Sequence, residues 1–375
     1  MKIVCDDKIP FLKGVFEPYA EVLYLPGKET RPETVRDADA LITRTRTVCD
    51  RNLLEGSGVK IIATATIGYD HIDTSWCESA GIEWANTPGC NSSSVRQYVT
   101  SVLCRLVSEF GLRFGNLTLG VVGVGHVGSK VADAASALGM KVLLCDPPRA
   151  RKEGPEGFVD LEEIIDKSDI ITLHVPLSKE GPDATWHLFD SERLSELKPS
   201  QILVNSSRGP VVDNASLKEC LKRKSLKAAV LDVWENEPEI DRELLDLLAL
   251  ATPHIAGYSA DGKANGTAAS VRTVARKLDL PLGNWSPSGI PAPRQALDFR
   301  LDAAGKTPQE VLCEAVLHTY DVAEDDTALR KNPGSFEKLR GDYPVRREFT
   351  AFHVSLDGGM EKAASALRRL GFEVD

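Results

Sequence analysis

The sequence predicts an α/β protein built around a doubly wound parallel sheet, and three observations support this. An apolar run from Leu117 to Val122 is followed by Gly123-x-Gly125-x-x-Gly128 and then by apolar residues at helical spacing. Further short apolar runs alternate with helical stretches along most of the chain. Several of these runs end in polar residues, and the carboxyl ends of strands are where an open parallel sheet binds its ligands.

The glycine motif predicts a strand, a tight turn and a helix whose N-terminus faces a phosphate group. Gly123 permits the turn, Gly125 lets a pyrophosphate approach the backbone, and Gly128 lets the helix pack closely on the strand. A second predicted strand, Lys141–Cys145, ends in Asp146, where a carboxylate can accept both hydroxyls of a ribose. These features together indicate a dinucleotide site that favours NAD, because Asp146 would repel the extra phosphate of NADP. Arg149 and Arg151 offer the alternative of a phosphate-binding pair, or they are solvated residues of a loop.

Length and composition limit the class of protein. A chain of 375 residues fits two or three domains, and its formal net charge of −10 argues against nucleic acid or an anionic membrane as the main partner. The eight cysteines are scattered without a Cys-x-x-Cys pair, which is typical of a reducing compartment. The N-terminus becomes acidic where a signal peptide would be apolar, and we find no apolar run long enough to span a membrane. We therefore expect a cytoplasmic protein, and we predict no metal site.

The remaining elements are expected in chain order. Before the glycine motif, a small parallel unit is predicted from β-like segments at Lys2–Cys5, Glu21–Leu25, Ala38–Thr43, Lys60–Thr64 and Ile82–Ala85. One long helix, Asn91 to Phe110, then leads into the nucleotide-binding sheet. Later strands of that sheet are expected at Asp169–Leu173, Gln201–Asn205, Ala228–Val233 and Ala249–Thr252, and helices at Leu161–Lys167, Ser191–Leu197 and Ala215–Arg223.

The last part of the chain predicts a small α+β domain. A helix from Gly262 to Leu278 is followed by a proline-rich linker, Leu280 to Pro293. Beyond the linker we expect a helix near Pro308–Tyr320, an alternating β segment from Glu348 to Leu356, and a final amphipathic helix from Glu361 to Leu370.

Chemically active residues follow several predicted strands. Arg208, Glu237 and His254 come after successive strands of the nucleotide-binding sheet. Arginine can grip a carboxylate, histidine can accept a proton near neutral pH, and a glutamate can orient the histidine ring. Taken singly, each residue has a structural interpretation: a surface arginine, a loop acid and a core histidine. Their shared position at one edge of the sheet instead indicates oxidation of a hydroxy acid.

Four motifs resemble the signature set of the D-isomer-specific 2-hydroxyacid dehydrogenases. They are Gly123-x-Gly125-x-x-Gly128, Asn205-Ser-Ser-Arg208-Gly209, Asp232-Val-Trp-Glu-Asn-Glu237-Pro238 and Thr252-Pro-His254-Ile-Ala-Gly257. The resemblance implies that Arg208, Glu237 and His254 are catalytic and that NAD takes the hydride. It also implies an NAD-binding Rossmann domain, residues 92–256, inserted in a discontinuous flavodoxin-like substrate-binding domain, residues 1–91 and 257–280.

Further motifs extend the resemblance over essentially the whole chain. They include Pro88-Gly-Cys-Asn91, His254-Ile-Ala-Gly-Tyr-Ser-Ala-Asp-Gly-Lys263 and Asp342-Tyr-Pro-Val-Arg-Arg347. They are similar to those of a branch of this family that oxidises a small phosphorylated hydroxy acid. The resemblance implies that residues 281–375 form a dimerisation domain and that the protein is a homodimer.

The same resemblance implies the binding residues. NAD contacts are expected at the following positions: Gly123, Gly125, His126, Val127, Gly128, Asp146, Val175, Ser206, Ser207, Asp232 and Gly257. Substrate contacts are expected at Arg44, Thr45, Arg46, Thr66 and Tyr258.

Some of these positions leave alternatives. Arg44 and Arg46 suit the substrate phosphate, although both also fit as solvated arginines, and Arg346 or Arg347 is a candidate to reach in from the dimer partner. Thr45 stands where serine is expected, and it keeps a hydroxyl. Val175 stands where threonine is usual, so only packing or a backbone contact with NAD is expected there.

Two other functions compete with this one. The chain could be another D-2-hydroxyacid dehydrogenase, such as phosphoglycerate dehydrogenase, with a regulatory C-terminal domain. It could also be an NAD-sensing, corepressor-like protein that binds peptides, as one branch of the family does.

Overall fold

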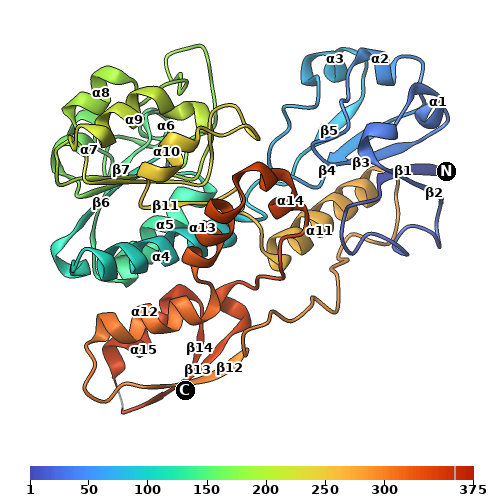
Figure 1. Ribbon diagram of the computed structural model, residues 1–375. Coiled ribbons are helices and arrows are strands. Elements are labelled where there is room, and N and C mark those ends of the chain that lie inside the picture. Colours follow the sequence, from blue (N-terminus) through green and yellow to red (C-terminus); the bar gives the residue numbers. More distant parts are fainter. Residues whose placement is uncertain (359) are drawn as a thin grey trace. The chain divides into compact units, whose positions relative to one another are not determined.

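The computed structural model describes residues 1–358 and 360–375, and the chain forms two compact units (Figure 1). The first unit contains residues 1–91 and 259–291, and the second contains residues 92–258 and 292–375. The predicted α/β class is confirmed at the level of two parallel sheets and a small C-terminal domain. The predicted three-domain division stays a prediction.

The first unit contains a five-stranded parallel sheet of order β2-β1-β3-β4-β5, the order found in flavodoxin-like sheets. The strands are β1 (Lys2–Asp6), β2 (Glu21–Leu25), β3 (Ala40–Thr43), β4 (Ile61–Thr64) and β5 (Glu83–Ala85). The helices are α1 (Pro32–Val35), α2 (Arg51–Leu54), α3 (Thr74–Ser79) and α11 (Ala260–Lys277), with a 3₁₀ turn η1 (Gly27–Glu29).

Alternate residues of the strands enter two separate apolar cores. Ile42 and Ile61 pack with Val271 of α11 in one core, whereas Leu41 and Ile62 pack with residues of α1 to α3 in the other. Both faces of the sheet are therefore buried, which explains why its central strands are apolar without polar alternation.

The second unit contains a six-stranded parallel sheet of order β11-β10-β9-β8-β6-β7. The strands are β6 (Thr118–Val122), β7 (Lys141–Cys145), β8 (Ile170–Leu173), β9 (Ile202–Asn205), β10 (Ala228–Leu231) and β11 (Leu250–Ala251). The helices around it are α4 (Ser92–Glu109), α5 (His126–Ala137), α6 (Pro147–Glu153), α7 (Leu161–Lys167), α8 (Ser191–Glu196), α9 (Asn214–Lys222) and α10 (Arg242–Leu247), with 3₁₀ turns η2 (Phe114–Asn116) and η3 (Gly209–Val211).

The order of this sheet reverses at β6. The chain passes from β6 to β7 on one side and then crosses to β8 on the other. An open parallel sheet binds its ligand at such a switch point, beyond the carboxyl ends of the strands. The topology therefore predicts a ligand site at the turns that follow β6 and β8.

The C-terminal part of the second unit forms a three-stranded parallel sheet of order β12-β13-β14 with helices beside it (Figure 1). Its elements are β12 (Asp298–Asp302), α12 (Pro308–Thr319), α13 (Val322–Lys331), η4 (Pro333–Ser335), α14 (Phe336–Gly341), η5 (Phe349–Ala351), β13 (His353–Asp357), α15 (Glu361–Leu370) and β14 (Glu373–Val374). One apolar core joins Leu312 and Leu367 of this part to Leu103 of α4 and Val131 of α5.

Two expected segments differ in the structure. For Arg149 and Arg151, the sequence left a phosphate-binding pair and a solvated loop as alternatives; the loop is wrong, since both lie in α6, which Asp146 caps and Pro147 opens. Residues 348–356 were expected as one β segment. The strand occupies only His353–Asp357, and η5 precedes it because Phe349 and Phe352 both enter the core.

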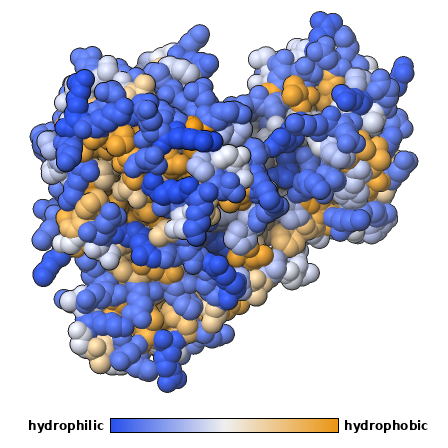
Figure 2. Space-filling model, viewed as in Figure 1, coloured by the Kyte–Doolittle hydropathy of each residue, from blue (hydrophilic) through white to orange (hydrophobic). Residues whose placement is uncertain are grey.

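All eight cysteines are free thiols. No helix within the described residues is long and apolar enough to cross a membrane. Hydrophilic residues cover most of the face seen in Figure 2, with apolar residues gathered in patches between them.

Candidate functional site

The glycine turn after β6 has the geometry of a dinucleotide cradle. A Cβ on Gly123 would lie 2.7 Å from the His174 carbonyl oxygen, and a Cβ on Gly128 would lie 1.9 Å from the Gly123 carbonyl oxygen. A Cβ on Gly125 would meet nothing within 4 Å. Gly123 and Gly128 are therefore required by the packing of the protein itself. Gly125 leaves open space at the first turn of α5, where the predicted contacts His126 and Val127 also lie.

Asp146 lies at the end of β7, beside this turn. Its Oδ2 accepts the Val124 N–H at 2.8 Å and its Oδ1 accepts the Arg149 N–H at 3.0 Å. Arg149 pairs with Glu153 one turn along α6 and donates to the Val124 carbonyl oxygen at 2.5 Å. The turn, the acid and α6 are thus joined, and Arg149 is engaged within this group.

The other predicted NAD contacts in the second unit have different surroundings. The Ser206 hydroxyl is buried without a hydrogen-bond partner, whereas the Ser207 hydroxyl donates to Asn205 Oδ1 at 2.8 Å. A Cβ on Gly123 would lie 2.8 Å from Val175 Cγ1, so Val175 lies beside the glycine turn. Its expected contact with NAD stays a prediction. Gly257 is partly exposed.

These residues fit NAD. The open space at Gly125 would receive the pyrophosphate, Asp146 would accept the ribose hydroxyls, and the unpartnered Ser206 hydroxyl has hydrogen-bonding capacity left for a ligand. Among the described residues, we find no group of three or more side chains that could hold a metal ion.

His254 and Glu237 meet in the structure as predicted from the sequence. The Nδ1 of His254 lies 2.7 Å from Oε2 of Glu237, and the other carboxylate oxygen accepts the Trp234 N–H at 2.9 Å. Because a carboxylate can only accept, the histidine carries a proton on Nδ1 and leaves Nε2 able to receive one. Both side chains are partly exposed, at 33% and 21%. This pair can accept a proton from a substrate hydroxyl.

The backbone at His254 has an uncommon conformation with φ of 56°, in the left-handed region. Asp232 fastens the residues that follow. Its Oδ1 accepts the Ile255 N–H at 2.8 Å, and its Oδ2 accepts the Ala256 N–H at 3.0 Å. Thr252 also donates to Asp232, at 2.6 Å. Asp232, a predicted NAD contact, is 1% exposed and thus already engaged within the protein.

Arg208 follows β9 and makes a hydrogen bond from Nη1 to the Ser207 carbonyl oxygen at 2.8 Å. The next residue, Gly209, lies against the loop that carries Glu237, since a Cβ there would be 1.9 Å from the Trp234 carbonyl oxygen. A glycine is required at this contact. It brings the loop of Arg208 directly against the loop of Glu237.

His174 directly follows β8 at the switch point. Its Nε2 lies 3.0 Å from Thr172 Oγ1, and its Nδ1 is buried without a partner. Burial lowers the pKa of His174 to about 3, because the imidazolium would be poorly solvated there. The ring is therefore neutral at physiological pH.

The predicted substrate contacts of the first unit lie at one edge of its sheet. Arg44, Thr45 and Arg46 follow β3, Thr66 follows β4, and these two strands are paired in register. Thr45 and Arg46 are exposed, and Arg44 donates to the Lys8 carbonyl oxygen at 3.3 Å. Thr66 shares a 2.7 Å hydrogen bond with Thr64. The turn after β3 offers cations and hydroxyls on one surface.

Tyr258, the predicted substrate contact in the second unit, packs against the C-terminal segment. Its ring meets that of Tyr343 edge-on at 5.8 Å, and the Arg340 guanidinium lies 5.7 Å from its centre. Arg346 and Arg347 are the candidates to reach into a partner's site, and this role stays a prediction. Arg346 is 4% exposed, and its Nη2 donates to the carbonyl oxygens of Ile255 and Ala256 in its own chain.

Sequence reasoning did not single out some residues near this site. His187 Nε2 lies 2.8 Å from Glu235 Oε1, and Glu235 also accepts the Asn214 N–H at 2.9 Å. This bonding fixes the loop just before Glu237. Neither this pair nor the setting of Arg346 leaves a periodic signal in the sequence, because each depends on contacts between distant segments.

Comparisons with known proteins agree with this geometry. Residues 97–256 match the NAD binding domain of the D-isomer specific 2-hydroxyacid dehydrogenases, and residues 294–371 match a domain of unknown function (DUF3410). The D-lactate dehydrogenase of Aquifex aeolicus, solved with NAD and lactic acid, is 27% identical with a TM-score of 0.62 over 78% of this chain and 100% of its own. The fold and the site therefore define a 2-hydroxyacid dehydrogenase with an NAD-binding domain.

Curated relatives narrow the class further. The erythronate-4-phosphate dehydrogenase of Bacteroides fragilis is 49% identical over 94% of this chain and 99% of its own. That of Pseudomonas syringae pv. syringae is 43% identical over 99% of both chains. The chain belongs to the erythronate-4-phosphate dehydrogenase family.

Proposed function

We propose that this protein oxidises 4-phospho-D-erythronate to 2-oxo-3-hydroxy-4-phosphobutanoate with NAD, in the biosynthesis of pyridoxal phosphate (vitamin B6). The family and the NAD-binding domain support the reaction class. The observation that carries the proposal is the pair of His254 and Glu237, 2.7 Å apart, in the unit that contains the glycine turn.

His254 acts as the general base. Its free Nε2 accepts the proton of the C2 hydroxyl as the C2 hydrogen leaves as hydride, so that C2 becomes a carbonyl carbon. NAD supplies the hydride acceptor, and the products are NADH, the 2-oxo acid and one proton. Glu237 keeps the ring in the reactive tautomer and stabilises the imidazolium that forms.

Arg208 binds the substrate carboxylate and stabilises the negative charge on the oxygen at C2. A guanidinium can form two parallel hydrogen bonds with a carboxylate, which fixes the orientation of C2. The residues that hold NAD in this proposal are Gly123, Gly125, His126, Val127, Gly128, Asp146, Val175, Ser206, Ser207, Asp232 and Gly257. Asp146 selects NAD over NADP.

Arg44 and Arg46 bind the phosphate group of the substrate. Thr45, Thr66 and Tyr258 are further substrate contacts. The exposed position of the turn after β3 and its positive charge support this role. Residues 1–91 with 257–280 then form the substrate-binding domain, and residues 281–375 form the dimerisation domain of a cytoplasmic homodimer.

The decisive experiment is an assay of NADH formation by the purified protein. We expect turnover of 4-phospho-D-erythronate that clearly exceeds turnover of 3-phosphoglycerate, D-glycerate and D-lactate. Preference for 3-phosphoglycerate would assign the protein to a different dehydrogenase reaction. Absence of turnover on all four, with nucleotide bound to the protein, would contradict the proposal and favour an NAD-sensing role.

A further inference from the structure

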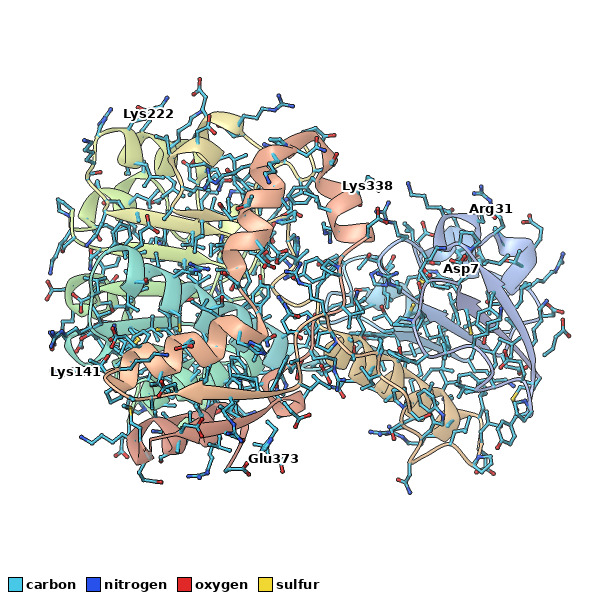
Figure 3. The ribbon with its side chains drawn as sticks, turned by 60° about the horizontal axis from the view of Figure 1, so that its bottom comes forward. Asp7, Arg31, Lys141, Lys222, Lys338 and Glu373 are labelled. Carbon is cyan, nitrogen blue, oxygen red and sulfur yellow. The ribbon has the colours of Figure 1, made fainter. Side chains whose placement is uncertain are left out.

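Arg346 lies in an environment unusual for a cation. It sits in the C-terminal segment between α14 and η5 and is 4% exposed, whereas the charged side chains of Lys141, Lys222 and Lys338 lie at the surface (Figure 3). Burying a guanidinium is unfavourable unless its donors are satisfied. The contacts of Arg346 therefore need a structural explanation.

Those contacts fall on the residues directly after His254. The Nη2 of Arg346 donates to the Ala256 carbonyl oxygen at 2.6 Å and to the Ile255 carbonyl oxygen at 3.3 Å. Asp232 holds the N–H groups of the same two residues. The segment is thus fixed on its N–H side by a residue next to β10 and on its carbonyl side by a residue of the C-terminal segment.

The guanidinium is itself held by a group of aromatic side chains. It lies 4.4 Å from the ring centre of Tyr320 and 5.8 Å from that of Tyr343. The hydroxyls of both tyrosines donate to Asp325 Oδ2 at 2.8 Å. Cation–π attraction and the nearby carboxylate offset part of the desolvation of the cation. The Nε of Arg346 is buried without a hydrogen-bond partner, whereas Nη1 and Nη2 both donate, so two of its three nitrogens hold the guanidinium in place.

The backbone conformation of His254 requires support from neighbouring residues. Its backbone has a φ of 56°, and a non-glycine residue in this left-handed region persists only where its surroundings enforce the conformation. We infer that Arg346 is a positioning residue for catalysis, holding the backbone of residues 255 and 256 so that the ring of His254 stays on Glu237. This role rests on the proposed function of His254 as the base.

The test compares Arg346, which is buried, with Arg330, which is partly exposed at 29%, in the full-length protein. Arg330 of α13 also donates to two backbone carbonyl oxygens, those of Leu245 and Leu248, but these lie in and after α10. We expect Arg346→Met to lower kcat on the order of 10- to 100-fold, with KM and the Kd for NAD changed less than about threefold. Arg330→Met should change kcat less than about threefold, and Arg346→Lys should recover part of the loss.

A second readout does not depend on turnover. In protein labelled with ¹⁵N-histidine, the Nδ1–H of His254 should give a strongly downfield proton signal because it donates to Glu237. That signal should weaken in Arg346→Met and persist in Arg330→Met. Equal effects of the two substitutions on kcat and on the signal would overturn the inference.

The inference stays testable if Arg346→Met does not fold or if the wild-type protein lacks the proposed activity. If Arg346→Met does not fold, Tyr343→Phe removes the hydroxyl that lies 3.4 Å from Arg346 Nη1 and bonds to Asp325. An unchanged kcat and signal in that variant would contradict the positioning role. If the wild-type protein does not oxidise 4-phospho-D-erythronate, the proposed function fails, while the NMR comparison still decides whether Arg346 positions His254.

Discussion

The carboxyl edges of the five-stranded and the six-stranded parallel sheets differ in how firmly they hold their candidate functional residues. After β3, Thr45 and Arg46 lie on an exposed turn. After β10 and β11, by contrast, His254 and Glu237 lie in loops held by Asp232, Arg346 and the backbone N–H of Trp234. Proton transfer requires atoms within hydrogen-bond reach, whereas a long cationic side chain can adjust to a phosphate. The loops that are held by hydrogen bonds thus suit proton transfer, whereas the exposed turn after β3 suits binding of a charged group.

Replacing His254 tests the edge of the six-stranded sheet most directly and should have the largest effect. We expect His254→Gln to lower kcat by about 10²- to 10⁴-fold, because a positioned base contributes that much, while the affinity for NAD stays close to that of the wild type. Steady-state kinetics and NAD titration would measure both. Wild-type turnover in the variant would exclude His254 as the base. It would also contradict the assignment of catalysis to the edge of the six-stranded sheet.

Replacing Arg44 tests the exposed edge. Arg44→Ala should raise KM for the phosphorylated substrate on the order of 10-fold or more, through loss of a charge-assisted hydrogen bond, with a smaller change in kcat. High salt should reduce the difference between the variant and the wild type. The matched control is Arg31→Ala, an exposed arginine of the same unit (Figure 3). An unchanged KM in Arg44→Ala would show that the turn after β3 does not bind the phosphate.

A methyl group at Gly125 would restrict the access of NAD to the edge of the six-stranded sheet without disturbing the packing of the glycine turn. Since a Cβ there meets no atom within 4 Å, Gly125→Ala should fold normally but raise the Kd for NAD by about 10-fold through contact with the pyrophosphate. Gly115→Ala is the matched control, because its Cβ also meets nothing. Equal NAD affinity in the two variants would place the pyrophosphate elsewhere.

The smallest effect concerns pH and stability at the switch point. The folded pKa of His174, about 3, lies below its unfolded value of 6.5, so the unfolded chain binds the extra proton between these values. Stability should therefore fall with decreasing pH in this window, by up to about 1.4 kcal/mol per pH unit from this residue. Denaturant unfolding at pH 7 and pH 5 should show a smaller difference for His174→Phe than for the wild type. Equal differences would mean that His174 does not contribute.

Much of the nucleotide-binding edge was predictable from the sequence, because its signals are local. The glycine turn, Asp146 and the strand ends before Arg208 and His254 are each encoded within a few residues, and the sheet topology brings them to one edge. Elements set by local apolar patterns, such as α7 and α15, begin and end where they were expected.

Other features depend on long-range packing and leave no such pattern. Arg346 has the sequence appearance of a surface cation, and only the assembly of Tyr320, Tyr343 and the segment after His254 buries it. β12 was not predicted because its residues, Asp-Phe-Arg-Leu-Asp, carry three charges and are mostly exposed. In both cases, partners distant in the sequence decide the structure.

The position of Asp146 also limits how this protein could evolve. The carboxylate caps α6 and accepts the Val124 N–H. An apolar substitution such as Asp146→Ala would remove this N-cap, at a cost of about 1 kcal/mol, and leave the Val124 N–H without its acceptor. Asparagine or serine would remove the negative charge but keep a capping oxygen. Under the proposed role of Asp146 in selecting NAD, fold stability therefore restricts the substitutions that can relax the preference for this cofactor.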